Sequence, residues 1–197
     1  MSKRLHVIYV PGVGDSDPEF QRWAVNLWKW WGVDSELFQI NWAENAKWEA
    51  RLRSLLSRID ELKAEEKSVA LVGASAGGSA VVNAYAARKT DITGVVTLCA
   101  KLKNPSDVGP KYRDANPPLI ASVTASDRAL SAFEAEDRAR ILTRRAFYDE
   151  VVTTKSDSIV EGARNQISPT PFHALTIGLQ LIFGAPGFLR FLKRQNR

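Results

Sequence analysis

The chain has 197 residues, a size that fits one domain with a full hydrophobic core. Its hydrophobic content of 45% and charged content of 25% are ordinary for a soluble globular protein. The net charge of +5 is mild, and Lys and Arg are scattered except at residues 190–197, which argues against a nucleic-acid-binding protein.

The number of cysteines and the length of the apolar segments further limit the class of protein and its cellular compartment. Cys99 is the only cysteine, which rules out an intrachain disulfide and fits a reducing, cytoplasmic compartment. One cysteine and two histidines argue against a zinc site, and we expect neither a metal nor a cofactor. The apolar run 5–10 is too short for a signal-peptide core. The apolar stretch 174–189 is interrupted by Gln180, Pro186 and three glycines, so we expect no membrane span.

The first third of the chain alternates between strand and helix patterns. A buried strand over 5–10 precedes a glycine-rich turn at 11–16. A helix is predicted over 19–31, and an alternating strand over 36–42. A long amphipathic helix follows over 48–64. The expected buried face of the first helix consists of Phe20, Trp23, Leu27 and Trp30 or Trp31. We expect the tryptophans here to be core and rim residues, with the wall of an aromatic acyl pocket as the alternative.

Residues 69–79 have the pattern of a nucleophile elbow. A short apolar strand, Val-Ala-Leu-Val, leads into Gly73-Ala74-Ser75-Ala76-Gly77, and a helix follows to residue 88 or 89. Gly73 and Gly77 give room for a sharp turn that exposes a serine above the sheet. This context predicts Ser75 as a catalytic nucleophile. The alternative is a turn of small residues that only lets strand and helix pack closely.

The glycine-rich turn at 11–16 is expected to lie beside the elbow and to help bind an oxyanion. The new helix directs its free N–H groups toward negative charge that develops near Ser75. The N–H of Ala76 and the N–H of Val13, from the turn after the first strand, are therefore the predicted oxyanion-hole donors. The alternative for residues 11–16 is a simple strand-to-helix connection.

The remaining chain completes the alternation. Strands are predicted over 92–98, over 141–148 and over 162–167, and the last helix begins near His173. The paired Arg144 and Arg145 place the second of these strands near the sheet edge. We predict one domain over 1–197, a three-layer α/β/α sandwich with a mostly parallel sheet of about six strands. Residues 101–138 are predicted to form a small helical excursion from the sheet, an insertion that could cover the site.

The order of these motifs resembles the α/β-hydrolase family, most closely the small, nearly lidless bacterial esterases and lipases. The resemblance rests on Pro-Gly-Val-Gly at 11–14, the elbow, Tyr-Asp-Glu-Val-Val at 148–152, and a lone His173 before the last helix. It implies the α/β-hydrolase fold with a minimal cap and the order serine, acid, histidine along the chain. Two features depart from the family pattern: Pro11 replaces a histidine found in many relatives, and Ser-Pro-Thr-Pro-Phe at 168–172 replaces a glycine-rich lead-in.

Carried onto this sequence, the resemblance implies His173 as the base and Asp149 as the acid. Asp127 competes if residues 119–124 form a strand, and Asp157 is a more distant alternative. The implied activity is a serine hydrolase, carboxylesterase- or lipase-like, that cleaves small esters or acyl substrates through an acyl-enzyme on Ser75. A non-catalytic binding protein of the same fold is the alternative function. Apolar and basic residues over 183–194 allow contact of the C-terminal helix with a lipid surface.

Overall fold

The computed structural model describes residues 4–14 and 18–196, which fold around one six-stranded parallel sheet. Every neighbouring pair of strands is parallel. The strands, in sheet order, are β2 (Asp34–Leu37), β1 (Leu5–Val10), β3 (Ser68–Ala74), β4 (Ile92–Leu98), β5 (Ile141–Ala146) and β6 (Arg164–Ser168).

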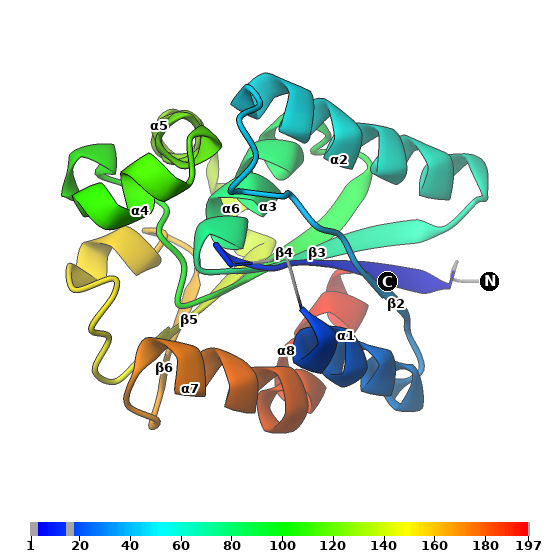
Figure 1. Ribbon diagram of the computed structural model, residues 1–197. Helices are drawn as coiled ribbons and strands as arrows, with labels where there is room; N and C mark the ends of the chain where they lie inside the picture. The colour runs from blue at the N-terminus through cyan, green and yellow to red at the C-terminus, as the bar shows by residue number, and fades with distance from the viewer. Residues whose placement is uncertain (1–3, 15–17, 197) are drawn as a thin grey trace.

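Helices cover both faces of the sheet and give the predicted three-layer α/β/α sandwich (Figure 1). One layer contains α2 (Trp48–Ala64), α3 (Ala76–Ala87) and α5 (Pro118–Ser131). The other contains α1 (Glu19–Asn26), η1 (Leu27–Trp31), α7 (His173–Leu179), the π-helical η4 (Gln180–Gly184) and α8 (Ala185–Gln195). The short helices η2 (Pro105–Asp107), α4 (Pro110–Ala115) and α6 (Ala135–Ala139) lie in the connection from β4 to β5, and η3 (Lys155–Ser158) lies between β5 and β6.

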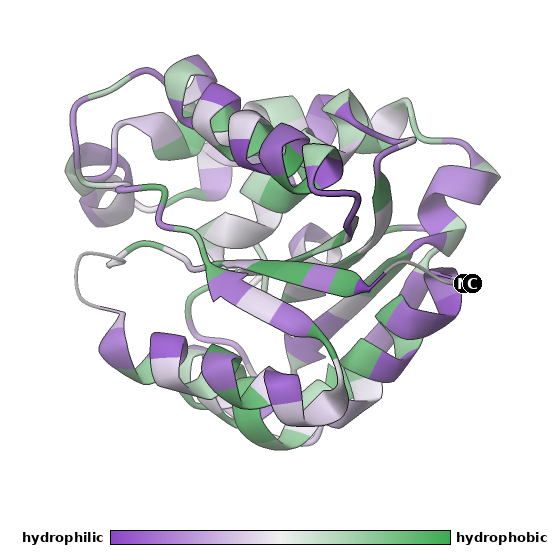
Figure 2. Cartoon of the chain, turned by 90° about the vertical axis from the view of Figure 1, so that its right-hand side faces the viewer, coloured by the Kyte–Doolittle hydropathy of each residue, from purple (hydrophilic) through white to green (hydrophobic). Residues whose placement is uncertain are grey.

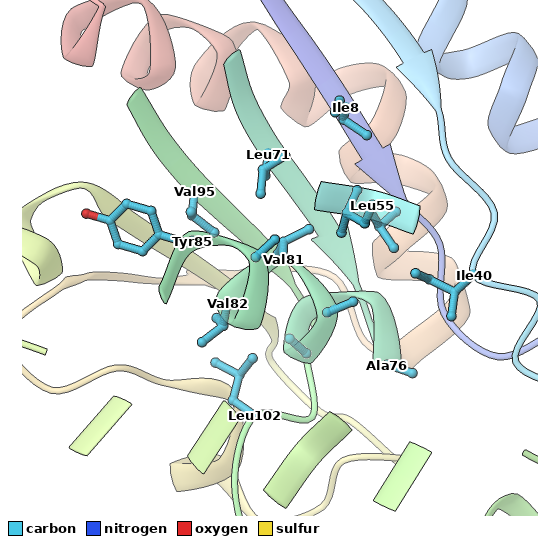
Figure 3. Packing of buried hydrophobic residues seen from close by; sticks show 14 of the residues in the cluster. Ile8, Ile40, Leu55, Leu71, Ala76, Val81, Val82, Tyr85, Val95 and Leu102 are labelled. Atoms are coloured by element: carbon cyan, nitrogen blue, oxygen red, sulfur yellow. The ribbon is translucent and has the colours of Figure 1, made fainter. Parts of the chain in front are cut away.

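The sheet separates two hydrophobic cores among the described residues. Successive strand side chains point to opposite faces, so Ile8 and Leu71 contribute to the core under α2, α3 and α5. There they pack with Leu55 and Val81 (Figure 3). Val7 belongs instead to the core under α1, η4 and α8. This burial on both faces explains why β1, β3 and β4 consist mainly of apolar residues and do not alternate. The edge strand β2, Asp-Ser-Glu-Leu, is partly exposed and more hydrophilic (Figure 2).

Most of the predicted elements are confirmed, and the exceptions have local causes. The strand over 92–98 and the helix over 48–64 have the expected limits. The strand expected over 36–42 is instead β2, Asp34–Leu37. Its pairing with β1 continues only to Phe38, whose N–H donates to the carbonyl of Tyr9 at 2.8 Å. Asn41 then has a φ of 59°, which lies outside the β region of a regular strand.

The predicted buried face of the first helix is wrong. Phe20, Trp23 and Trp30 are 52%, 53% and 80% exposed. The buried residues are instead Ala24, Val25 and Trp28. The helix continues as a 3₁₀ helix from Leu27, and Trp28 lies on the same buried face as Ala24, four residues before it. There its indole N–H donates to the carbonyl of Leu181 at 2.9 Å, and its ring meets that of Phe188 edge-on.

The C-terminal helical segment is longer than its apolar stretch suggests. By length and composition, His173–Gln195 is the one helical segment of the described chain that could cross a membrane. In this fold its second half belongs to the core, because Phe188, Leu189 and Leu192 of α8 are buried against the sheet. Packing therefore accounts for the apolar character of α8.

Replacing Gly77 by alanine tests the contact between α3 and the first strand. An added Cβ would lie 2.1 Å from the carbonyl oxygen of Val10 and 2.6 Å from that of Pro11. Because both neighbours are backbone atoms, we expect Gly77→Ala to lower the free energy of unfolding by about 3 kcal/mol or more in urea denaturation. Gly109→Ala is the control, since its nearest neighbour lies 4.0 Å away. Equal unfolding midpoints for the two variants would contradict this packing.

Candidate active site

Ser75 connects the end of β3 to the start of α3 in a backbone conformation that side chains rarely adopt. Its φ is 52° and its ψ is −121°. Hydrogen bonds hold it on both sides: its N–H donates to the carbonyl of Leu98 at 2.9 Å, and its carbonyl accepts from Gly78 at 3.0 Å and Lys101 at 3.2 Å. Strain of this kind persists where the surrounding structure enforces it, and it clusters at functional sites.

Glycines make this turn possible. A Cβ on Gly73 would lie 2.3 Å from the carbonyl oxygen of Gly77, so neither position has room for a side chain. A Cβ on Gly12 would lie 2.7 Å from the Cβ of Ser75. The turn after β1 therefore contacts Ser75 directly. Asp15 and Ser16, the last two residues of the predicted turn, lie outside the described residues.

The two predicted oxyanion-hole residues lie beside Ser75. Val13 and Ala76 line a small cavity of about 50 Å³ together with it. Ala76 is the first residue of α3, where backbone N–H groups have no partner within the helix. The indole N–H of Trp42 donates to the carbonyl of Pro11 at 3.2 Å, which fixes the start of the other turn.

His173 and Asp149 form a buried pair. The Nδ1 atom of His173 lies 3.0 Å from each carboxylate oxygen of Asp149, and the two side chains are only 9% and 8% exposed. The same carboxylate accepts the backbone N–H of Val151 at 3.0 Å and that of Val152 at 2.8 Å. The acid is thus held by its own loop as well as by the imidazole.

Backbone contacts join the loops that carry the pair. The N–H of Phe147 donates to the carbonyl of Thr170 at 3.2 Å, and the N–H of Phe172 donates to the carbonyl of Tyr148 at 2.8 Å. Glu150 accepts the backbone N–H of His173 at 2.9 Å, at the N-terminus of α7, where a negative charge is favourable. These contacts fix His173 at the start of its helix.

The pKa of Asp149 is below its usual value. Burial alone would raise it, but the hydrogen bond from His173 and the N–H groups of Val152 and Val151 outweigh burial. Because the folded-state pKa is lowered, the ionised Asp149 stabilises the fold above its unfolded-state pKa. That contribution is lost as the pH falls through the folded-state value. Asp149 is therefore an ionised partner for His173 at neutral pH.

Cys99 is the third member of this cluster. The Sγ atom and the nearest ligand atoms of Asp149 and His173 all lie within 4.8 Å of one another. Burial, and next the charge of Asp149, raise the pKa of the Cys99 thiol to about 12. These three donor types could hold a metal ion. An ion would have to remove the proton from a buried thiol and separate Asp149 from His173, so the arrangement favours the hydrogen-bonded pair.

Ser75 and His173 line one cleft of about 440 Å³. Its walls are mainly apolar and come from β3, α1 and α7 with η4; they include Ala74, Phe20, Ile177, Gly178 and Leu181. Tyr112 of α4 borders both this cleft and the smaller cavity. Within the described chain no hydrogen bond joins the Ser75 hydroxyl to His173; catalytic hydrogen bonds are often long until substrate binds.

The other candidate acids lie elsewhere. Asp127 is on α5, since residues 119–124 are helical, and its carboxylate accepts the N–H of Asn104 at 3.2 Å. Asp157 is fully buried and pairs with Lys101. Asp149 alone of the three contacts His173 in the described residues.

Two residues near the pair were not singled out from the sequence. Cys99 directly follows β4, and Glu150 follows Asp149 in the loop after β5. Neighbouring parallel strands end at the same edge of a sheet, so the position of Cys99 next to the loop of Asp149 is the signal that could have found it. The capping role of Glu150 depends on a contact between distant loops that leaves no local pattern.

Comparisons with known proteins place this geometry in a known fold. No protein-family profile and no curated protein sequence matches the chain. Solved structures do match. The structure for LipS and LipT, two metagenome-derived lipolytic enzymes, aligns with 98% of this chain and 95% of its own, at 13% identity and a TM-score of 0.73. Est1E from Butyrivibrio proteoclasticus aligns over 99% and 89%, at 15% identity and a TM-score of 0.74.

A third match is a monoacylglycerol lipase from Paleococcus ferrophilus, which covers 96% of this chain and 94% of its own at 15% identity and a TM-score of 0.67. At these identities the likeness concerns the fold. The chain therefore has the α/β-hydrolase fold that its motif order predicted.

The high pKa of Cys99 predicts an unreactive thiol. At pH 8 we expect iodoacetamide to alkylate Cys99 in the folded protein at least about 100-fold more slowly than in the urea-unfolded chain, because the thiolate is the reactive form. Mass spectrometry gives a clear result, since the chain has one cysteine. Comparable rates in both states would show that the thiol is accessible and ionised, against the structure.

Proposed function

We propose that the protein is a serine hydrolase that cleaves carboxylic esters through an acyl-enzyme on Ser75. The observation that carries the proposal is the cleft that Ser75, on its strained turn, shares with His173, whose Nδ1 contacts Asp149 at 3.0 Å. Nucleophile, carboxylate and imidazole follow one another along the chain in the order of α/β-hydrolases, and the solved structures of similar fold include lipolytic enzymes.

In the first step Ser75 attacks the acyl carbon of the ester. Asp149 accepts a hydrogen bond from the Nδ1–H group of His173, so the neutral ring carries its lone pair on Nε2. Nε2 takes the hydroxyl proton of Ser75 as the Oγ–carbon bond forms, and the Asp149 carboxylate stabilises the resulting imidazolium. His173 then passes the proton to the departing alkoxide, and the alcohol leaves.

In the second step water cleaves the acyl-enzyme. His173 takes a proton from the water as it attacks the acyl carbon, and returns that proton to Ser75 as the carboxylic acid is released. The N–H groups of Val13 and Ala76 are the proposed donors to the oxyanion in both steps. In such sites one donor contributes about 3 kcal/mol to the transition state.

The cleft favours a substrate with an uncharged acyl group. Phe20, Ile177 and Leu181 give one side of Ser75 an apolar wall. On the other side the small cavity is lined by Gly109 and Tyr112. We propose the larger side for the acyl group and residues 105–115 as a minimal cap over the alcohol side. The rest of the 101–138 excursion contributes α5, which packs against α3 as part of the sheet cover.

The test is hydrolysis of p-nitrophenyl esters of graded acyl length. We expect wild type to hydrolyse them, and Ser75→Ala to lower kcat/KM by about 10⁴-fold or more because no acyl-enzyme can form. Ser57→Ala removes an exposed serine hydroxyl on α2, outside the cleft and the small cavity, and should leave kcat/KM unchanged.

A second pair of variants separates the candidate acids. Asp149→Asn should lower kcat by about 10⁴-fold, since a neutral amide cannot stabilise the imidazolium and its NH₂ group favours the wrong tautomer of His173. Asp127→Asn should match wild type. If no ester were hydrolysed above the rate of Ser75→Ala, a binding function for this fold would replace the proposal.

A further inference from the structure

The outer surface of α1, η1, α7 and η4 is unusually apolar. On α1 and η1 the exposed aromatic residues include Phe20, Trp23 and Trp30, which follow one another at intervals of three and seven. On α7 and η4, Leu175 and Phe183 are 49% and 76% exposed. No charged residue occurs from 174 to 189. We call these five residues the aromatic surface.

The two parts of this surface are adjacent. A Cβ on Gly178 would lie 3.6 Å from the ring of Phe20, so α1 lies directly against α7. The rings of Phe20 and Trp23 are 5.9 Å apart. Both helices lie on the same side of the sheet (Figure 1). Contiguous exposed apolar residues of this kind mark an interaction site.

Positive charge accompanies the surface. Arg22 and Lys29 lie between its aromatic residues, and Arg190, Lys193 and Arg194 are exposed on α8. Lys193 donates to the carbonyl of Trp31, which brings the α8 cations to the end of η1. Glu19 is the single acidic residue from 18 to 33, and the chain has none after Glu161.

We propose that the aromatic surface docks onto an anionic lipid–water interface. Tryptophan and phenylalanine side chains insert at the level of the headgroups, and the cations around them attract acidic lipids. Phe20 belongs both to this surface and to the wall of the active-site cleft. Docking would therefore bring the mouth of the cleft to the interface.

The experiment is flotation of the full chain with vesicles, without substrate, so its result does not depend on the role of Ser75. We expect wild type to float with phosphatidylglycerol–phosphatidylcholine vesicles, to bind phosphatidylcholine alone weakly, and to be released by high salt. Trp23→Ser combined with Trp30→Ser should lower the partition coefficient by about 10-fold or more. Phe147→Ser is the matched control, because Phe147 is 70% exposed but lies outside the surface.

Tryptophan fluorescence of wild type gives a second readout that needs no variant. Transfer of Trp23 and Trp30 to the interface should shift the emission to shorter wavelength when anionic vesicles are added. Absence of flotation and of this shift would overturn the proposal, as would equal binding by the double variant. A wild-type dimer that the double variant makes monomeric, without vesicle binding, would show that a second copy of the chain covers the surface instead.

Discussion

The site depends on one steric constraint: the approach of the β3–α3 turn to the end of β1. Ser75 keeps a φ of 52° because the backbone on either side is hydrogen-bonded to the strand and loop beside it. That approach is possible only where Gly73 and Gly77 have no side chain, since a Cβ at either would lie within 2.3 Å of a carbonyl oxygen. The same closeness brings Gly12 against the Cβ of Ser75 and so places the Val13 turn beside the proposed nucleophile.

The opposite wall of the site is built by loops that the parallel sheet brings to one edge. Asp149 follows β5, and His173 follows β6, so a carboxylate and an imidazole 24 residues apart meet at 3.0 Å. Cys99, after β4, is buried next to them, with its Sγ within 4.8 Å of their nearest ligand atoms, and its raised pKa keeps it a neutral thiol. A protonated thiol leaves the carboxylate as the charged partner of His173, which is the electrostatic arrangement that a general base requires.

Local patterns in the sequence were sufficient for the fold and for the elbow. Apolar runs gave the buried strands, and the short Gly-x-Ser-x-Gly segment between a strand and a helix gave Ser75. Such local patterns do not reveal which distant segments of the chain contact one another. The choice of Asp149 over Asp127 depends on which loop meets His173. Motif order did not decide it; the preference came from the resemblance of residues 148–152 to the family's acid loop and from the one short strand that fits before His173. Phe20, Trp23 and Trp30 share one helical face, but it is the exposed one, and spacing alone does not show which face of a helix meets the sheet.

The central claim is that Ser75 is a nucleophile activated by His173. A fluorophosphonate probe, followed by peptide mass spectrometry, tests it most directly, because the probe forms a stable adduct only with an activated hydroxyl or thiol. The account predicts one adduct, on Ser75, that is lost in His173→Ala although this variant retains the Ser75 hydroxyl. An unmodified wild-type protein, or an adduct on Cys99 instead, would contradict it.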